Sequence, residues 1–391
     1  MAIKKSKISM FPVISHYPSQ YPPQAEEICV TCSGALVGLL KEITSMMLRL
    51  HSNHTSLPPA TFFLMGIPGL EETHLWLAAL LSTMYTMVLV GNSLIMTVIW
   101  ADPALHEPMY YFLCVLAGVD IIMATSVAPK MLSIFWSGNG TIAFTACFTQ
   151  MYIVHTATAL ESGLLLAMAF DRYVAICKPL HYNTILTPQK ILGINVAIVV
   201  RATIALTPLS WMVSNLQYCG SHAVPHSYCE HMAVANLACS DHRTSNLYAL
   251  IGSSVVVGMD VAFISASYSL ILQAVFNLSS KNARHKALST CGSHVGVMAL
   301  FYLPGLISVY VDWWGQDMVP VHTQVLLADL YLVIPPTLNP LIYGLRSKKI
   351  CQGIWNTMAT SLPCHHYVNS KRERRPKQVL VMGDIRSTHE I

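Results

Sequence analysis

The chain alternates long apolar runs with short polar segments. Seven runs have about 20 residues or more, the length that crosses the hydrocarbon core of a bilayer as a helix. They are Leu75–Trp100, Met109–Ile134, Cys147–Phe170, Ile191–Met212, Leu247–Gln273, Ala287–Val311 and Thr323–Tyr343. The pattern therefore predicts an all-α membrane protein built as a seven-transmembrane helix bundle.

The same pattern divides the chain into three parts. Residues 1–60 are predicted to be an extracellular N-terminal extension, 61–355 the seven-helix domain and 356–391 a cytosolic tail. The connections are short except for a loop of about 35 residues between the fourth and fifth spans. The apolar stretch Ile28–Leu40 is too short to span a membrane.

Basic residues predict the orientation of the spans. Most lysines and arginines of the short loops lie in the loops after spans one, three and five. The loops on the opposite side contain only Arg243. Because cytosolic loops are enriched in lysine and arginine, this bias places the N-terminus outside the cell and the tail inside. The first set consists of Arg172, Lys178, Lys190, Lys281, Arg284 and Lys286.

Composition agrees with a membrane protein. The chain is 53% hydrophobic and 11% charged, with a mean hydropathy of +0.49, which is too apolar for a soluble domain. Ionisable residues inside the spans are costly and are candidates for function. They are Asp120, Lys130, His155, Glu161, Arg201, Asp260, His294 and Asp329. Lys130 is close enough to a helix end to reach the interface, whereas the sequence identifies no partner for Arg201.

The third span ends in an acid, an arginine and a tyrosine at Asp171, Arg172 and Tyr173. Two interpretations are open: Arg172 marks the membrane edge, or Asp171 and Arg172 form a switch. Glu161 and Arg172 are three helical turns apart and share one side of the helix. Cys147 lies about 37 Å before Arg172 along a helix, more than the bilayer core, so one helix links both membrane faces.

Four cysteines are expected in the oxidising exterior: Cys147, Cys219, Cys229 and Cys239. Spacing alone leaves three disulfide pairings open. The long loop also contains histidines, and a zinc or copper site is the alternative that these residues raise. Paired cysteines are not thiolate ligands and the histidine spacing matches no closed site, so we predict no metal. The histidines are His222, His226, His231 and His242.

The seventh span combines Asn339, Pro340 and Tyr343. Pro340 lacks a backbone donor and kinks the helix, and Asn339 can bind the groups that the kink frees. Together with Asn92, Asp120 and Glu161 it predicts a polar, hydrated core. At the other side of the membrane, the triplet beginning at Asn53 predicts a glycan on the N-terminal segment.

Enzyme and transporter chemistry finds little support. The pair at His106 and Glu107 is followed by Pro108, which excludes the HExxH zinc motif, and there is no glycine-rich phosphate loop. Two related halves with interrupted helices, typical of many transporters, are absent. We therefore predict a receptor without enzyme activity or cofactor that lies in the lipid bilayer and does not bind nucleic acid. An ion-conducting or transporting membrane protein is the remote alternative.

Seven motifs in order resemble the odorant receptors, a branch of the rhodopsin-like G-protein-coupled receptors. They are "GN" at Gly91, "HEPMYYFL" from His106, "MAFDRYVAICKPLHY" from Met168, "SY" at Ser267, "KALSTCGSHV" from Lys286, "FYLP" from Phe301 and "PPTLNPLIYG" from Pro335. The likeness covers about Thr61 to Trp355. "GIPGLEE" from Gly66, "SYCEHMAVANLAC" from Ser227 and "GMD" from Gly258 resemble the class I, fish-like branch.

The resemblance implies a small-molecule odorant as ligand and a stimulatory, olfactory-type heterotrimeric G protein that raises cyclic AMP. It also implies disulfides Cys147–Cys229 and Cys219–Cys239, and location in the plasma membrane of olfactory cilia. The switch at the G-protein face would comprise Asp171, Arg172, Tyr173, Asn339, Pro340 and Tyr343. The ligand-binding residues would be Met151, His155, Thr158, Ala159, Met232, Gly252, Val256, Tyr302, Leu306 and Val309.

Two features depart from the family pattern. Many class I receptors have "HRFG" at the outer end of the sixth helix, whereas this chain has "DWWG" at Asp312, Trp313 and Trp314. The arginine is replaced, and we expect acid and aromatic groups there to favour neutral or cationic ligands. Family members also start near Met46 or Met47, so residues 1–45 are interpreted as an alternative upstream start or a gene-model error rather than as a domain. A non-olfactory chemosensory receptor is the main alternative function.

Overall fold

The computed structural model describes residues 34 and 38, 60–277, 280–314 and 318–361. Within them, seven helices are long and apolar enough to cross a membrane. They are α2 (His74–Ala101), α3 (Pro108–Ser137), α4 (Phe144–Cys177), α6 (Pro188–Ser214), α8 (Arg243–Phe276), α9 (Lys281–Trp314) and α10 (Val321–Arg346). The predicted seven-span, mainly helical fold is confirmed, and each helix extends beyond its predicted apolar run. Predictions about Asn53, residues 1–45 and residues 362–391 lie outside the described residues.

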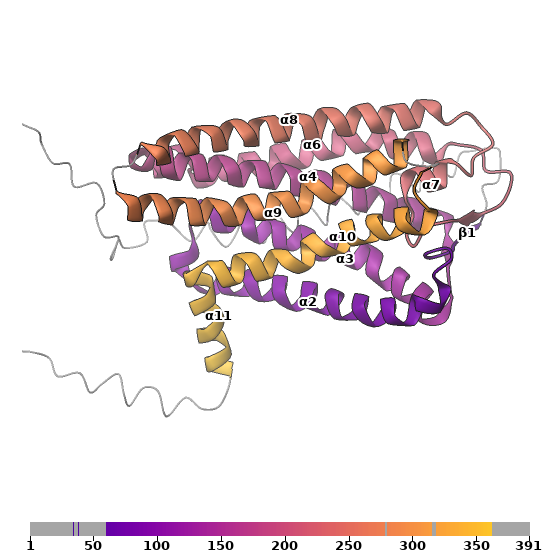
Figure 1. Cartoon of the computed structure of the whole chain (residues 1–391), viewed down its shortest axis with the longest axis horizontal. Helices are drawn as coiled ribbons and strands as arrows, with labels where there is room; N and C mark the ends of the chain where they lie inside the picture. Colours follow the sequence, from indigo (N-terminus) through magenta and orange to yellow (C-terminus); the bar gives the residue numbers. More distant parts are fainter. Residues whose placement is uncertain (1–33, 35–37, 39–59, 278–279, 315–317, 362–391) are drawn as a thin grey trace, which may run out of the picture.

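The seven long helices run side by side along the length of the molecule (Figure 1). The strand β1 (Thr61–Leu64) and the short helix α7 (His231–Ala235) lie at one end of this bundle, and α11 (Lys348–Ser361) turns away from it at the other (Figure 1). These two ends are called the sheet end and the α11 end below.

Burial separates central from peripheral helices. In their most apolar windows, 72% of α3 and 67% of α4 are buried inside the bundle, compared with 11% of α8. Large apolar side chains such as Trp76, Ile204 and Phe263 are exposed on the outer helices. A bilayer, unlike water, accommodates such a surface, so the exposure follows from the membrane environment.

A three-stranded sheet joins the N-terminal segment to two distant loops. Strand β1 is central, antiparallel to β2 (Thr141–Ala143) and parallel to β3 (Ala223–Val224). Phe62 is buried among the rings of Phe144, Phe148 and Tyr218. The strands are too short to show a recognisable alternation of apolar and polar residues, so the sequence did not predict the sheet.

The amphipathic helix α11 was not predicted either. Its Ile350 is fully buried, and a side chain at Gly353 would collide with Val98 of α2. Trp355, by contrast, is exposed. The helix therefore packs one face on the bundle, and the predicted boundary after residue 355 falls within it. The remaining short elements are η1 (Glu71–Thr73), η2 (Pro103–Leu105), η3 (Pro179–His181) and α5 (Tyr182–Ile185).

Helices α2 and α10 approach closely at the "GN" motif. A Cβ atom added to Gly91 would lie 2.9 Å from the ring of Pro340. The next residue, Asn92, is buried and donates from Nδ2 to the carbonyl oxygens of Val88, at 3.0 Å, and Pro336, at 3.2 Å. The absence of a side chain at Gly91 thus lets Asn92 bind α10 backbone beside its prolines.

Candidate functional site

The Asp171–Arg172 pair lies at the α11 end of α4. The Asp171 carboxylate is fully buried and accepts from Arg172 Nε at 3.0 Å and Nη2 at 2.6 Å. Tyr182, in α5, donates its hydroxyl proton to the other carboxylate oxygen at 2.7 Å. Burial, the nearby Asp171 charge and this hydrogen bond raise the pKa of Tyr182, which keeps its proton. The Asp171–Arg172 pair is therefore bound to α5 as well. An arginine that only marked the membrane edge would not need these contacts.

A second contact at the α11 end joins α8 to α9. The Tyr268 hydroxyl and His294 Nδ1 are 2.6 Å apart. The ring of Tyr343, on α10, lies 6.5 Å from the His294 ring. Tyr173 is half-buried and packs against the apolar cluster around Ile271 between α4, α8 and α9. The predicted switch residues Tyr173 and Tyr343 thus lie beside the contact between α8 and α9.

The predicted polar core is assembled around Asn339. Its Nδ2 donates to Asp120, at 3.1 and 3.3 Å, and to Glu161 Oε1 at 3.4 Å. All three side chains are buried, and the second carboxylate oxygen of Glu161 has no partner. Among the described residues no cation pairs with either acid. One amide therefore links α3, α4 and α10 next to Pro340.

Arg201, for which the sequence indicated no partner, pairs with Asp260. Its Nη1 and Nη2 bind the two carboxylate oxygens at 2.5 and 2.9 Å, and Nη2 also donates to the Ala159 carbonyl at 3.3 Å. The two-point geometry is the one in which arginine binds carboxylates most strongly. The sequence placed both charges inside spans but could not indicate that α6 and α8 would bring them together.

Ser162 connects this ion pair to the sixth span. Its hydroxyl donates to Asp260 Oδ2 at 2.6 Å and lies 2.9 Å from the Tyr302 hydroxyl. Tyr302 is one of the predicted ligand residues, and Ser162 follows Glu161 of the polar core in the chain. Two adjacent residues of α4 therefore touch two buried polar networks, a role that sequence analysis did not assign to Ser162.

Disulfides fix the loop between α6 and α8 over the sheet end. They join Cys147 to Cys229 and Cys219 to Cys239, the pairing that the resemblance implied. The Cys229 amide also donates to Gln150 Oε1 at 2.9 Å. A few residues earlier, the hydroxyl of Ser227 donates to Asp329 on α10. The loop thus reaches from α4 to α10 across the end of the bundle.

Acid and histidine side chains of this loop are buried. Burial lowers the pKa of both His226 and His231 to about 3, so both rings are neutral at physiological pH. Burial raises the pKa of Glu230, which accepts the Ala233 amide at 2.7 Å and caps α7. In the described part of the chain no group of three His, Cys, Asp or Glu residues could hold a metal ion.

Four of the ten predicted ligand residues lie on α4 and one on α7. Met151 is buried, while Thr158 donates to the Val154 carbonyl at 3.0 Å. The buried Nε2 of His155 has no partner, and its ring lies 6.4 Å from that of His231. Met232, beside His231 in α7, is half-buried. His155 thus keeps a free hydrogen-bonding atom next to the loop.

The other predicted ligand residues lie on α8 and α9. Gly252 and Val256 are half-buried on α8, and a Cβ atom at Gly252 would meet nothing within 4 Å. On α9, Tyr302 is buried, but Leu306 and Val309 are 53% and 39% exposed. The structure therefore brings Tyr302 into the core and leaves Leu306 and Val309 on the surface of the bundle; ligand contact by all ten stays a prediction.

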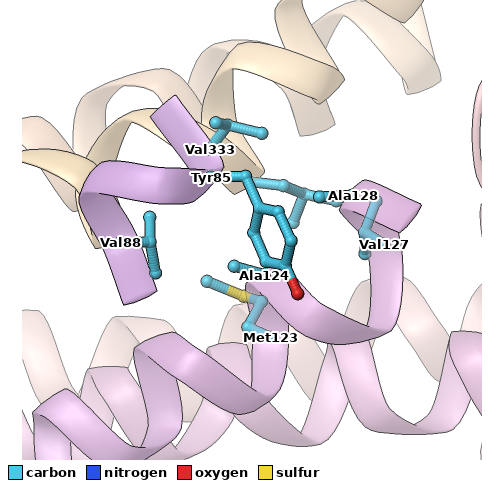
Figure 2. Close-up of a pocket in the computed structure, with 8 residues that line it drawn as sticks. Tyr85, Val88, Met123, Ala124, Val127, Ala128 and Val333 are labelled. Atoms are coloured by element: carbon cyan, nitrogen blue, oxygen red, sulfur yellow. The ribbon is translucent and has the colours of Figure 1, made fainter. Parts of the chain in front are cut away.

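A small apolar cavity lies elsewhere, between α2, α3 and α10 (Figure 2). Figure 2 shows Tyr85 of α2 facing Met123 and Ala124 of α3. The lining residues are Tyr85, Val88, Met123, Ala124, Val127, Ala128, Leu332 and Val333. None of these is a predicted ligand residue, so this cavity is distinct from the predicted ligand site.

Comparison with known proteins places this architecture in a family. Residues 81–360 match the olfactory receptor family model. Human olfactory receptor 52I2 is 64% identical over 330 residues, 84% of this chain and 94% of the relative. Human olfactory receptor 52I1 is 64% identical over 318 residues, 81% of this chain and 98% of the relative. Human olfactory receptor 52P1 is 49% identical over 298 residues, 76% of this chain and 92% of the relative.

The family-model match begins within α2 and ends within α11, so it includes both buried polar networks. The named relatives are receptors, which agrees with the prediction that the chain is not an enzyme. They also agree with the class I features of the sequence. The chain belongs to the olfactory receptor family, as a multi-pass membrane protein of its class I branch.

Proposed function

We propose that this receptor binds a small volatile or semi-volatile molecule at the sheet end and activates a stimulatory, olfactory-type G protein at the α11 end. The product of that activation is a rise in cyclic AMP. The proposal places the sheet end outside the plasma membrane of olfactory cilia and the α11 end in the cytosol. It also assigns residues 61–355 to the receptor domain, and the segments before and after it to an extracellular extension and a cytosolic tail.

A chain of buried polar contacts carries the proposal. Tyr302, among the predicted ligand residues, touches Ser162, whose neighbour Glu161 binds Asn339. Asn339 lies next to Pro340 and one turn before Tyr343, whose ring is 6.5 Å from that of His294. A ligand that shifts Tyr302 would thus disturb hydrogen bonds that continue toward the α11 end.

Release of Arg172 from Asp171 would be the last step. The salt bridge and the Tyr182 hydrogen bond hold Asp171 on both carboxylate oxygens. A ligand can shift this equilibrium only by binding the released arrangement more tightly. The freed Arg172 would then be available to the G protein at the end of α4.

Cyclic AMP in cells that express the chain with the olfactory G protein tests this function. We expect a panel of acids, alcohols, ketones and amines to include an activator, and the response to vanish in Arg172→Ala. Tyr302→Phe removes only the hydroxyl that touches Ser162 and should weaken the response. Tyr85→Phe is the matched control, because the Tyr85 hydroxyl bonds Thr125 outside this chain of contacts.

Two results would contradict the function. One is the absence of any response to the panel while the receptor is at the cell surface. The other is an equal response in Arg172→Ala and the unsubstituted chain, which would show that the Asp171–Arg172 pair has no part in signalling.

A further inference from the structure

A carboxylate is buried near the sheet end with half of its hydrogen-bonding capacity unused. Asp329 lies in the third turn of α10 and is 5% exposed. Its Oδ1 accepts the hydroxyl proton of Ser227, which is fully buried in the loop. Its Oδ2 is also buried and has no hydrogen-bond partner. A buried acid in this condition costs free energy unless another group completes it.

No cation of the described residues balances Asp329. The ion pairs found there use Asp171, Asp260 and Glu107 as their acids. His226, next to Ser227, is no substitute: its Nδ1 accepts the Ser227 amide at 3.1 Å, and burial keeps its pKa at about 3. Asp120 and Glu161 of the polar core both accept a hydrogen bond from Asn339, whereas Asp329 accepts one only from the hydroxyl of Ser227.

Asp329 lies against the loop that also contacts the α4 helix. Ser227 lies two residues before Cys229, whose disulfide and Gln150 contact anchor the loop to α4. The loop segment 227–229 therefore crosses from α10 to the helix that carries Met151 and His155. The ring of His155, whose buried Nε2 has no partner, lies 6.4 Å from the ring of His231, which follows this loop segment in α7.

We propose that Asp329 is the ligand-anchoring residue of this receptor, and that it binds the ammonium group of small organic amines. The inference rests on the proposed function and names its ligand class. An ammonium supplies both a positive charge and donors for Oδ2, giving charge-assisted hydrogen bonds inside a poorly solvated site. A carboxylate ligand would bring a second negative charge to a buried acid and is disfavoured there.

The sequence at the end of α9 agrees with this ligand class. Asp312 and Trp313 replace the histidine and arginine that many class I receptors carry, as noted above. The structure does not describe the Asp312 side chain, so Asp329 is the described acid on which the inference depends.

Binding is measured on the purified full chain in lipid nanodiscs, independently of any G protein. Hexylamine, hexanol and hexanoic acid present three head groups on the same alkyl chain, and thermal stabilisation of the receptor reports their affinities. We expect hexylamine to bind most tightly, and Asp329→Asn, which keeps the size and a Ser227 acceptor, to weaken it at least about tenfold. Hexanol binding should change by less than about threefold.

Ser227→Ala is the matched control. It removes the bond to Oδ1 and retains the acid, so it should preserve the preference for hexylamine. The inference is overturned if hexylamine gives no stabilisation, if hexanol or hexanoic acid binds more tightly, or if Asp329→Asn leaves hexylamine affinity unchanged. A receptor that binds hexylamine through Asp329 but raises no cyclic AMP would refute the signalling function and leave this inference intact.

Discussion

Removing the Asp260 carboxylate should destabilise the receptor more than removing a surface acid. In Asp260→Ala, Arg201 loses two hydrogen bonds and its countercharge, and Ser162 loses its acceptor. Breaking one side of a fully buried pair costs about 3–5 kcal/mol. Because the Arg201 side chain is 28% exposed and keeps the Ala159 carbonyl, we expect a cost near the lower limit, about 3 kcal/mol.

The cost is measurable as a change in the thermal unfolding midpoint. For a domain of this size 1 kcal/mol corresponds to roughly 2 °C, so Asp260→Ala should unfold about 6 °C lower in lipid nanodiscs. Glu107→Ala is the comparison, since the Glu107–Lys349 pair is about half exposed on both sides and is worth about 1 kcal/mol or less.

A double variant separates the ion pair from the loss of packing. Replacing Arg201 by Met and Asp260 by Leu together removes both charges, so the double variant should be more stable than Asp260→Ala. Equal midpoints for Asp260→Ala and Glu107→Ala would refute the reasoning. The reasoning would also be refuted if the stability lost in the double variant equalled the sum of the losses in Arg201→Met and Asp260→Leu. Losses at independent sites add, whereas losses at coupled sites do not.

Three further predictions concern other parts of the molecule. Tyr182→Phe removes one of the two holds on Asp171 and should raise ligand-independent cyclic AMP; an unchanged basal level at equal surface expression would contradict a locking role. Gly91→Ala forces a methyl group against Pro340 and should cost about 1–3 kcal/mol, whereas Gly193→Ala, where nothing lies within 4 Å, should not lower the unfolding midpoint. The pKa of His226 and His231, lowered to about 3 by burial from a reference of 6.5, means that the unfolded chain binds more protons below pH 6.5. The stability present above pH 6.5 should therefore fall as the pH drops toward 3, and the double variant His226→Gln, His231→Gln should show a flatter dependence of its unfolding midpoint on pH.

The spans could be predicted from the sequence because hydropathy is a local property. Each apolar run became a helix that extends a few residues further, since polar residues at membrane edges still form helical hydrogen bonds. The sheet was missed because strands of two to four residues carry too short a pattern. Helix α11 was missed for a different reason: it has one apolar face and a low average hydropathy.

The sequence predicted which polar residues of the candidate site are buried, but it did not predict which groups they bind. Burial of Asp120, Glu161 and Asp260 was expected from their places in apolar runs. Which groups they bind depends on how the helices pack, so Arg201–Asp260 and Ser227–Asp329 could not be paired from one sequence. The charge balance offered one clue, since Arg201 required a buried acid and few were available.

The central position of β1 sets the order in which the sheet end can be assembled. The ribosome makes β1 before any of the seven spans, but β2 follows two of them and β3 follows four. Until then the backbone amides of Phe63, Leu64 and Met65 lack their acceptors, which are the carbonyl oxygens of His222, Gly140 and Val224 respectively. Because four of the seven spans precede β3 in the chain, this small sheet can be completed only after more than half of the helices have been made, and until then β1 presents unpaired backbone groups.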